Sequence, residues 1–252
     1  MSNVYLLEAK MEFLKSARMK AYSLSTILFP CMFYIFFGLA MAPQEPKGFM
    51  PMARYLLATY GAFGVMGATL FAFGVGLAVE RGLGWMQVKR ASPMPPAAYF
   101  LAKGAVALGF AAIVVALLFS LGALAGNVRM PVSQWLAMGA TLIAGAVPFC
   151  ALGLAIGNLA GPNSAPAAVN MIYLPMSFCG GLWIPFDFLP HTLQRIAPFL
   201  PSFHFSQIAL AVLGAHTQGS VAGHAGALAG FTLIFAAIAW AAHLRDREKM
   251  FG

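Results

Sequence analysis

The side chains that could carry out chemistry are scarce in this chain, and they form no catalytic or metal-binding pattern. The sequence holds seven acidic residues, five histidines and three cysteines among 252 residues. It contains no G-x-x-x-x-G-K-[ST] phosphate loop, no H-E-x-x-H zinc motif and no C-x-x-C pair. We therefore expect no catalytic residue, no metal site and no cofactor bound by this chain.

Four of the five histidines fall within residues 191–224: His191, His204, His216 and His224. Their spacings of 13, 12 and 8 residues match no zinc pattern. We expect these imidazoles to form hydrogen bonds at a membrane interface rather than to bind a metal.

Segment 80–98 mixes charges of both signs with large apolar side chains. Its charged residues include Glu80, Arg81, Lys89 and Arg90, and they surround Trp85 and Met86. Aromatic, methionine and arginine side chains are enriched in the cores of protein interfaces. The segment therefore fits a docking surface for a partner protein, and it equally fits a membrane-surface helix with an interfacial tryptophan.

The distribution of charged residues indicates whether the chain is surrounded by water or by lipid. Residues 130–186 contain no Asp, Glu, Lys or Arg, and charged residues make up only 9% of the chain. About a quarter of residues are charged in soluble domains. A backbone that crosses hydrocarbon must satisfy its own hydrogen bonds, so these apolar stretches predict transmembrane helices. The predicted fold class is an all-α polytopic membrane protein.

A spanning helix needs about 20 apolar residues, so the chain has room for six spans and no separate soluble domain. We expect them at about 22–41, 55–79, 100–124, 134–157, 166–184 and 224–243. The first stretch is longer than the apolar region of a signal peptide, so we expect it to be retained. An amphipathic interface helix should precede it at 3–20. Residues 185–222 hold four prolines and should form short external re-entrant helices.

Lysines and arginines set the expected orientation. With six spans, the side that carries both termini holds eleven Lys and Arg residues, and the other side holds four. Cytoplasmic loops carry the excess of positive charge. We therefore expect both termini to be cytoplasmic and residues 1–252 to form one transmembrane domain.

The sequence offers no residues that are expected to supply energy for transport. No charged residue falls at the centre of an expected span, whereas ion-coupled transporters usually keep one there. An intramembrane lipid-modifying enzyme would need grouped carboxylates, and the few acidic residues are not grouped outside the terminal segments. If the chain drives transport, we expect a partner to supply the energy.

Two segments resemble a known family. Glu80-Arg81-Gly82, a short amphipathic stretch, Ala91-Ser92-Pro93-Met94-Pro95 and Leu101-Ala102-Lys103 resemble the second-to-third-span loop of ABC-2 type ABC transporter permeases. The run Cys179-Gly180-Gly181-Leu182-Trp183-Ile184-Pro185-Phe186, followed by Leu189-Pro190, Ala197-Pro198 and Leu200-Pro201, resembles that family's fifth-span exit and external helices. The resemblance covers nearly the whole chain and is greatest to small bacterial drug and lipo-oligosaccharide exporters.

The resemblance implies a permease subunit of an exporter in the bacterial cytoplasmic (inner) membrane. Such a subunit moves an amphipathic drug, lipid or glycolipid outward, and a separate ATPase subunit binds ATP and Mg²⁺. Two permeases and two ATPases form the working unit, as a homodimer or heterodimer of permeases. Ion or polysaccharide export remains an alternative within the family.

The resemblance also implies roles for particular residues. Segment 80–98 would be the coupling loop that docks on the ATPase, through Glu80, Arg81, Trp85, Lys89 and Arg90. The N-terminal helix would brace the same ATPase through Glu8, Glu12 and Lys15. The substrate pathway between the two permeases would be lined by the second and fifth spans, at Phe71, Phe73, Asn170, Tyr173, Met176 and Phe178. For each aromatic or methionine residue, core or lipid-facing packing is the alternative.

Overall fold

The computed structural model describes residues 2–41, 50–91 and 94–248. These residues form helices joined by turns, and no β-strand occurs among them. The predicted all-α class is therefore confirmed for this part of the chain.

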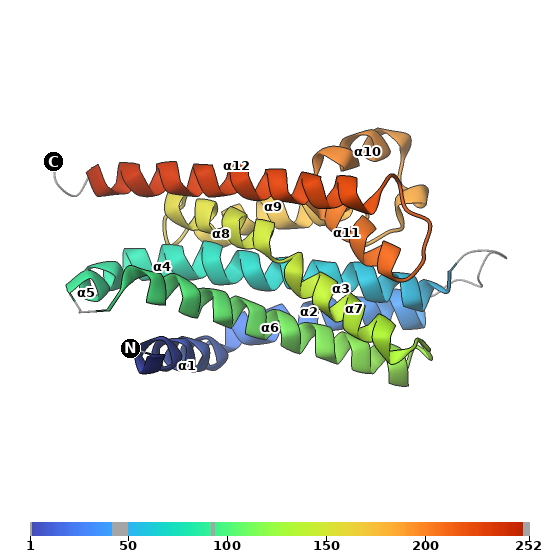
Figure 1. Ribbon diagram of the computed structural model, residues 1–252, viewed down its shortest axis with the longest axis horizontal. Helices are drawn as coiled ribbons and strands as arrows, with labels where there is room; N and C mark the ends of the chain where they lie inside the picture. Colours follow the sequence, from blue (N-terminus) through green and yellow to red (C-terminus); the bar gives the residue numbers. More distant parts are fainter. Residues whose placement is uncertain (1, 42–49, 92–93, 249–252) are drawn as a thin grey trace.

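The helices follow one another as an elongated bundle (Figure 1). The elements of the first half are α1 (Ser2–Arg18), α2 (Lys20–Phe33), π-helical η1 (Tyr34–Ala40), α3 (Met52–Leu70), π-helical η2 (Phe71–Val75), α4 (Gly76–Gly82), α5 (Trp85–Ala91) and α6 (Pro96–Leu124). Those of the second half are α7 (Val132–Ala144), α8 (Val147–Leu159), α9 (Ala165–Cys179), η3 (Phe186–Phe188), α10 (His191–Ile196), η4 (Ala197–Phe199), α11 (Pro201–Val212) and α12 (Val221–Glu248).

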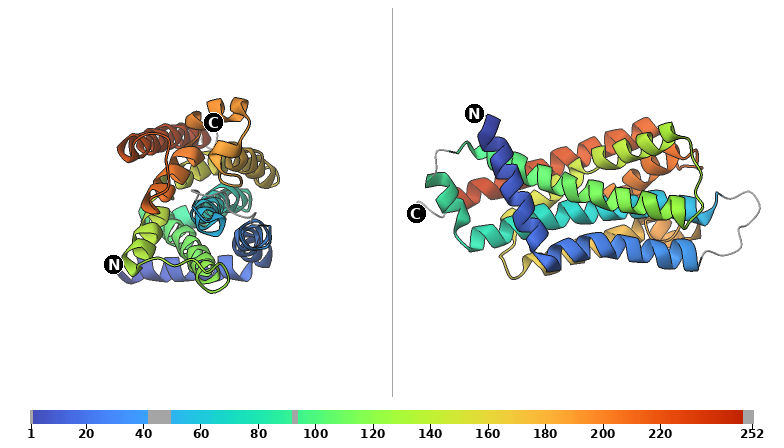
Figure 2. Two further views of the ribbon diagram at one scale, coloured as in Figure 1. Left: turned by 90° about the vertical axis from the view of Figure 1, so that its right-hand side faces the viewer. Right: turned by 90° about the horizontal axis from the view of Figure 1, so that it is seen from below.

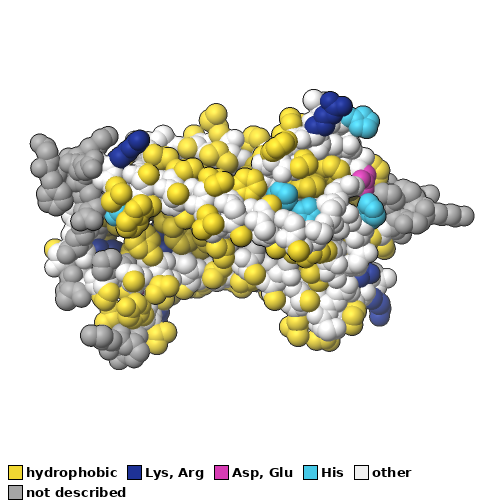
Figure 3. Space-filling model, turned by 45° about the horizontal axis from the view of Figure 1, so that its top comes forward, with side chains coloured by type: hydrophobic (Ala, Val, Ile, Leu, Met, Phe, Trp, Pro, Cys, Tyr) yellow, Lys and Arg dark blue, Asp and Glu magenta, His cyan; other side chains and the backbone are white. Residues whose placement is uncertain are grey.

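Five helical segments of the described chain are long and apolar enough to cross a membrane: Tyr22–Ala40, Met52–Gly82, Ala97–Leu124, Val132–Leu159 and Val221–Arg245. The fifth expected span, at about 166–184, falls on α9, which has 15 residues and is shorter than a full crossing. On the face drawn in Figure 3, Lys and Arg side chains lie toward the two ends and a broad apolar surface separates them. The molecule is therefore a multi-helix membrane protein.

Helix α3 forms the centre of the bundle. Every residue from Leu56 to Leu70 is buried, and α2, α6, α8, α9 and α11 all pack on this helix or on η2. Figure 2 shows α3 in the middle of the end-on view, with the other helices around it. A helix that is apolar on all sides is buried in this way. The second expected span is therefore the core of the molecule.

Glycines allow α8 to approach η2 closely. A Cβ atom at Gly153 would lie 2.8 Å from the Phe73 Cβ, and one at Gly157 would lie 2.6 Å from the Phe73 carbonyl oxygen. Gly226 and Gly230 show the same spacing on α12 but have nothing within 4 Å of such an atom. Only the first of these two G-x-x-x-G pairs therefore serves close packing in the described structure.

Helix α1 runs across one end of the bundle at a steep angle to the long helices (Figure 2). Its apolar side chains point away from the bundle and are exposed: Val4, Leu7, Met11 and Leu14. Its opposite face carries Glu12, which is buried, and Phe13, whose ring lies 5.4 Å from that of Phe110 on α6. This arrangement suits a helix that lies in a membrane interface, with its apolar side toward lipid.

Two different ends can be distinguished along the bundle. One end, here called the α5 end, gathers α1, α5 and the last turns of α12 (Figure 1). The other, the α10 end, gathers α10 and the first turns of α7 and α12. At the α10 end Arg54 of α3 donates hydrogen bonds to Gln134 Oε1 (3.0 Å) and to the Leu213 carbonyl (3.2 Å). These bonds tie α3 to α7 and to the end of α11.

A histidine pair fastens α11 to α12. The Nδ1 atoms of His204 and His224 lie 2.8 Å apart, and His204 Nε2 lies 2.9 Å from the Pro198 carbonyl oxygen. Because a carbonyl only accepts, His204 Nε2 carries the hydrogen, and neutral His204 then accepts at Nδ1 from His224. Of the four expected interfacial histidines, these two do form hydrogen bonds.

Substituting Gly157 tests the close approach of α8 to η2. Gly157→Ala should lower the free energy of unfolding by about 1–3 kcal/mol, because the added methyl meets a backbone carbonyl that cannot rotate away. Gly230→Ala is the matched control and should be neutral or slightly stabilising. Denaturant titration in detergent micelles measures both. Equal effects from the two substitutions would contradict this account of the packing.

Acidification tests the histidine pair. Burial, together with the neighbouring His224, lowers the pKa of His204, although its bond to Pro198 opposes the shift. Its folded pKa therefore lies below the unfolded value of about 6.5, and the pair's stabilisation is lost as pH falls from about 6.5 through the folded pKa. The protection of α11 amides against hydrogen exchange, corrected for the intrinsic pH dependence of exchange, should therefore fall as pH drops from about 6.5 towards about 5. His204→Phe should abolish this pH dependence, while the exposed His191→Phe should keep it.

Candidate functional site

A buried ionic cluster joins three helices at the α5 end. Its members are Glu12 and Lys15 of α1, Glu80 of α4, and Tyr99 and Lys103 of α6. Lys103 Nζ lies 2.9 Å from Glu12 Oε1 and 3.0 Å from Glu80 Oε1. Lys15 donates to both carboxylates, and the Tyr99 hydroxyl donates to Glu80 Oε2. Each carboxylate is thus shared between the two lysines.

Three of the four charged side chains in the cluster are almost completely buried. The side chains of Lys103, Glu80 and Glu12 are 3%, 6% and 7% exposed, whereas that of Lys15 is 45% exposed. Removing a charge from water costs several kcal/mol unless opposite charges and hydrogen bonds compensate it. Two carboxylates and two ammonium groups balance here, so the cluster has no net formal charge. Its geometry fixes α1 against α4 and α6.

Lys15 keeps its charge in this arrangement. Burial opposes the charged form, but the hydrogen bonds and negative charges of Glu80 and Glu12 outweigh it and raise the pKa of Lys15. A lysine whose pKa is raised stays protonated throughout the neutral range. The ion pairs of this residue are therefore not a pH switch.

A second ion pair extends the connection to α5. Lys89 Nζ lies 2.7 Å from Glu8 Oε1 of α1 and 4.1 Å from the centre of the Tyr99 ring. The ammonium group thus combines a salt bridge with a cation–π contact. Together with the ionic cluster, this pair makes α1, α4, α5 and the start of α6 one connected unit.

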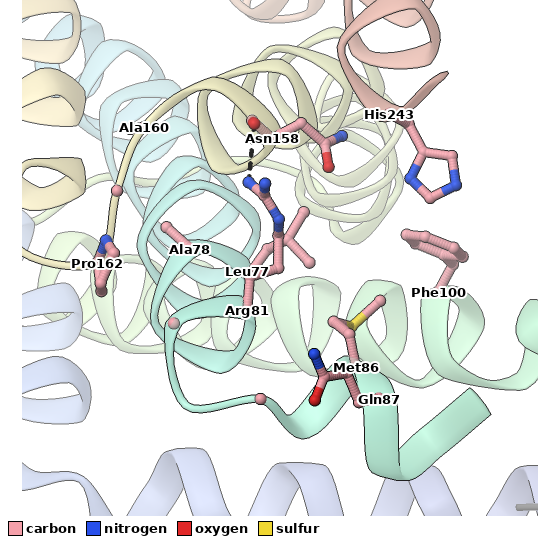
Figure 4. A pocket seen from close by; sticks show the side chains of 13 residues that line it. Leu77, Ala78, Arg81, Met86, Gln87, Phe100, Asn158, Ala160, Pro162 and His243 are labelled. Atoms are coloured by element: carbon pink, nitrogen blue, oxygen red, sulfur yellow. Dashed lines mark hydrogen bonds between the residues drawn. The ribbon is translucent and has the colours of Figure 1, made fainter. Parts of the chain in front are cut away.

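Arg81 forms a separate connection, to the end of α8. Its Nη1 atom donates to the carbonyl oxygens of Gly157 and Asn158, at 2.7 Å each. Figure 4 shows this side chain in a cavity of about 290 Å³, with Met86 and Gln87 of α5 on one side and Phe100 and His243 on another. Carbonyls at a helix C-terminus carry partial negative charge and suit a guanidinium group. Arg81 therefore ties the end of α4 to the last turn of α8.

The expected coupling residues divide into two groups in the structure. Glu80 and Glu12 are buried and bind partners within this chain. Both therefore support the packing of α1, α4 and α6, and the contact with an ATPase that was expected of them stays a prediction. Trp85 is 51% exposed, and Lys89 and Glu8 are partly exposed. The side chain of Arg90 lies outside the described residues.

Sequence reasoning missed Tyr99 and Lys103 as functional residues. Lys103 was part of the Leu101-Ala102-Lys103 motif but was given no role, because a lysine near the start of an apolar segment usually reaches the interface by itself. Its position three residues inside the third expected span was the available signal, because a charge within such a helix needs a partner. The partner could not be identified without knowing how α1 crosses α6.

A second feature is a groove along one flank of the bundle. Helices α2 and α9 lie on the same side of α3, which forms the floor between them (Figure 2). The groove holds a cavity of about 320 Å³ lined by Tyr22, Ser25, Thr26, Phe29, Pro30, Gly67, Phe71, Asn170, Tyr173 and Leu174. Tyr173 is held in place because its hydroxyl donates to the Phe63 carbonyl (3.1 Å) and its ring stacks on Phe63 at 4.7 Å.

The structure brings three of the six expected pathway residues into this groove: Phe71, Asn170 and Tyr173. The other three do not line it. Phe73 is buried beside Ala72 and Ala107, Met176 is buried in the core, and Phe178 packs edge-on to Trp183 at 6.3 Å. Phe71 and Phe73 both lie in the π-helical turn η2, but Phe71 lines the groove cavity whereas Phe73 is buried in the core.

The fold defines a multi-helix membrane protein whose helices are joined by a buried ionic cluster at one end. Residues 5–214 match the family model described as ABC-2 type transporter. The chain therefore belongs to the ABC-2 type transporter family, whose members are membrane subunits of ABC transporters and normally pair with an ATPase subunit. It is also 29% identical, over 203 residues, to a Bacillus subtilis (strain 168) protein named "Putative transport permease YvfS", covering 81% of this chain and 82% of that protein.

Charge balance in the ionic cluster gives a stability test. Lys103→Met leaves two buried carboxylates with one lysine, so we expect the free energy of unfolding to fall by about 3–5 kcal/mol. Combining it with Glu12→Gln should recover part of the loss, because one carboxylate then faces one lysine. Lys20→Met, at an exposed position on α2, is the control. Denaturant titration in micelles measures all three, and a strictly additive double variant would contradict the shared network.

Proposed function

We propose that this chain is the permease subunit of an exporter that moves an uncharged or zwitterionic amphipathic compound (a drug, lipid or glycolipid) out across the bacterial cytoplasmic membrane. ATP and Mg²⁺ are bound by a separate ATPase subunit. The observation that carries this proposal is the connected unit at the α5 end, in which the ionic cluster and the Glu8–Lys89 pair join α1 and α5 to the central span.

The proposed topology has six spans and cytoplasmic termini. Helix α9 becomes the fifth span, with the turn that follows it completing the crossing. The prolines between α9 and α12 favour short re-entrant helices at the external side, where η3, α10, η4 and α11 lie. The excess of Lys and Arg at the α5 end supports a cytoplasmic location for that end.

Movement of α5 by the ATPase would be transmitted through side chains that resist separation. Pulling α1 from α4 would expose unpaired charges to a low-dielectric interior, so the joined helices move as one body. Since α4 continues through η2 into α3, the same displacement reaches the groove. ATP can drive the change only if the ATPase binds the two permease conformations with different affinity.

Two copies of the permease would place their grooves opposite each other. Exposed Asn170 supports this arrangement, because an amide on a membrane-spanning surface favours a protein partner over lipid. The groove also carries Ser25 and Thr26 between aromatic rings, a mixture that suits amphipathic molecules. The copies form either a homodimer or a heterodimer with a related chain.

Substituting Trp85 tests coupling. Trp85→Ala should weaken binding of the ATPase about tenfold or more, since a partly exposed tryptophan in an interface is a typical hot spot. Trp240→Ala is the matched control, because Trp240 is 65% exposed and belongs to α12 rather than to α5. Co-purification measures binding, and ATP-dependent accumulation of a fluorescent amphipathic dye in inside-out vesicles measures transport.

The controls separate the parts of this proposal. If Trp85→Ala binds its ATPase and transports as the unchanged protein does, the coupling role of α5 is wrong. If the intact complex hydrolyses ATP but accumulates no amphipathic compound, and instead moves an ion or a polysaccharide, the substrate class is wrong while the family assignment stands.

A further inference from the structure

Two cavities adjoin each other on the groove side of the bundle and share two side chains. The groove cavity, between α2, α3 and α9, has been described above. An entrance cavity of about 280 Å³ lies at the α5 end, between α1, α4, α5 and α6. Tyr22 and Phe71 line both cavities. The boundary between the two spaces is therefore formed by these two aromatic side chains.

We propose that the two cavities are consecutive parts of one path for uncharged amphipathic molecules, and that Tyr22 and Phe71 form the constriction between them. The inference rests on the proposed export function, because it specifies how a substrate reaches the groove and which substrates pass. It assigns a selective role to Tyr22, which sequence patterns did not single out.

Tyr22 is anchored on the side facing the core. Its hydroxyl donates to the Ala68 carbonyl at 3.3 Å, and its ring meets Phe110 edge-on at 5.1 Å. The residue is only partly buried, so part of the ring remains at the cavity wall. It lies in the first turn of α2, directly after the break that ends α1 at Arg18. A shift of α1 therefore reaches Tyr22 within a few residues.

Phe71 lies on the floor of the groove and is anchored by a ring contact. Its ring meets Tyr173 edge-on at 6.1 Å, and it too is partly buried. It opens the π-helical turn η2, which continues into α4 and its buried Glu80. π-helical turns inside α-helices occur frequently at functional sites. Tyr22 thus lies on the helix that follows α1, and Phe71 on the turn that continues into α4, while the ionic cluster joins α1 to α4.

The entrance cavity selects against net charge. One wall is formed by the ionic cluster, where Glu12, Lys15, Glu80 and Lys103 already neutralise one another. A charged ligand would lose its hydration without gaining an unpaired partner. The remaining wall is largely apolar and includes Val79, Leu83 and Trp85. Such a space receives an uncharged molecule with a large apolar body.

The groove cavity suits the same class of molecule and also offers a hydrogen-bond acceptor. No Asp, Glu, Lys or Arg is among its lining residues. Asn170 donates from Nδ2 to the Pro166 carbonyl at 3.1 Å, and its amide oxygen accepts no hydrogen bond from the described residues. An amide oxygen in an apolar groove favours a ligand with a hydroxyl or amide donor. The preferred substrate is therefore an uncharged amphiphile that carries at least one such donor.

Photolabelling of the full permease, bound to its ATPase in lipid nanodiscs, tests the path. The probe is a long-chain alcohol that carries a benzophenone, and mass spectrometry locates the labelled residues. We expect labels both at residues 79–85 of the entrance cavity and at residues 170–174 of the groove cavity. Analogues with the same chain but a carboxylate or a trimethylammonium group should label the groove at least about tenfold less, because the cavities offer them no unpaired charge.

Enlarging the constriction side chains should separate the two cavities. Tyr22→Trp and Phe71→Trp should each lower labelling of residues 170–174 at least about fivefold while labelling of residues 79–85 is kept. Tyr22→Ala and Phe71→Ala should have the opposite effect on the groove. Phe36→Trp is the matched control, because Phe36 is 53% exposed on η1 and lines neither cavity. Size-exclusion profiles confirm that each variant is folded.

Three results would overturn the inference. In the first, the tryptophan variants leave the ratio of groove to entrance labelling unchanged. In the second, a charged analogue labels the groove as strongly as the alcohol does. In the third, the groove is labelled without the entrance cavity, which means that molecules arrive from the surrounding bilayer. Labelling needs no ATP hydrolysis, so its failure is distinguishable from a failure of the Trp85→Ala transport test.

Discussion

The arrangement of this protein depends on the cost of burying charge in a membrane domain. Glu12, Glu80 and Lys103 are almost fully removed from solvent, and each is tolerable only because the others, together with Lys15, compensate it. Those residues come from an interface helix, from the end of the central span and from the start of the next span. Separating any of these elements would leave an uncompensated charge. The electrostatic penalty therefore acts as a mechanical connection between helices that are distant in the sequence.

This connection gives the α5 end a different character from the rest of the bundle. Along the spans, packing depends on apolar contacts and on small residues, as where Gly153 and Gly157 admit the backbone of η2. Such contacts are strong collectively but allow helices to slide. At the α5 end, by contrast, ion pairs with defined geometry hold α1, α4, α5 and α6.

The groove lies where such a displacement would have most effect. Its floor is α3 and η2, which continue directly from α4, and one wall is α2, which follows α1. In the proposed mechanism, Tyr22 and Phe71 would connect the transmitted motion to the space that a substrate would occupy. The chain belongs to the ABC-2 type transporter family, whose membrane subunits normally pair with an ATPase subunit.

The amino-acid sequence by itself determined that the chain lies in a membrane and which class of protein it belongs to. The uncharged stretch at 130–186 required helices in a membrane, the motifs around Glu80 and Cys179 led to the family, and Phe71, Asn170 and Tyr173 were expected where the groove lies. Only the tertiary structure decided that Glu80 points inward and that Phe73 belongs to the core. It also decided that Lys103 bridges two carboxylates contributed by other helices. The physical reason is that burial and ion pairing depend on how helices cross, and residues 12, 80 and 103 meet only once α1 has been laid across α4 and α6.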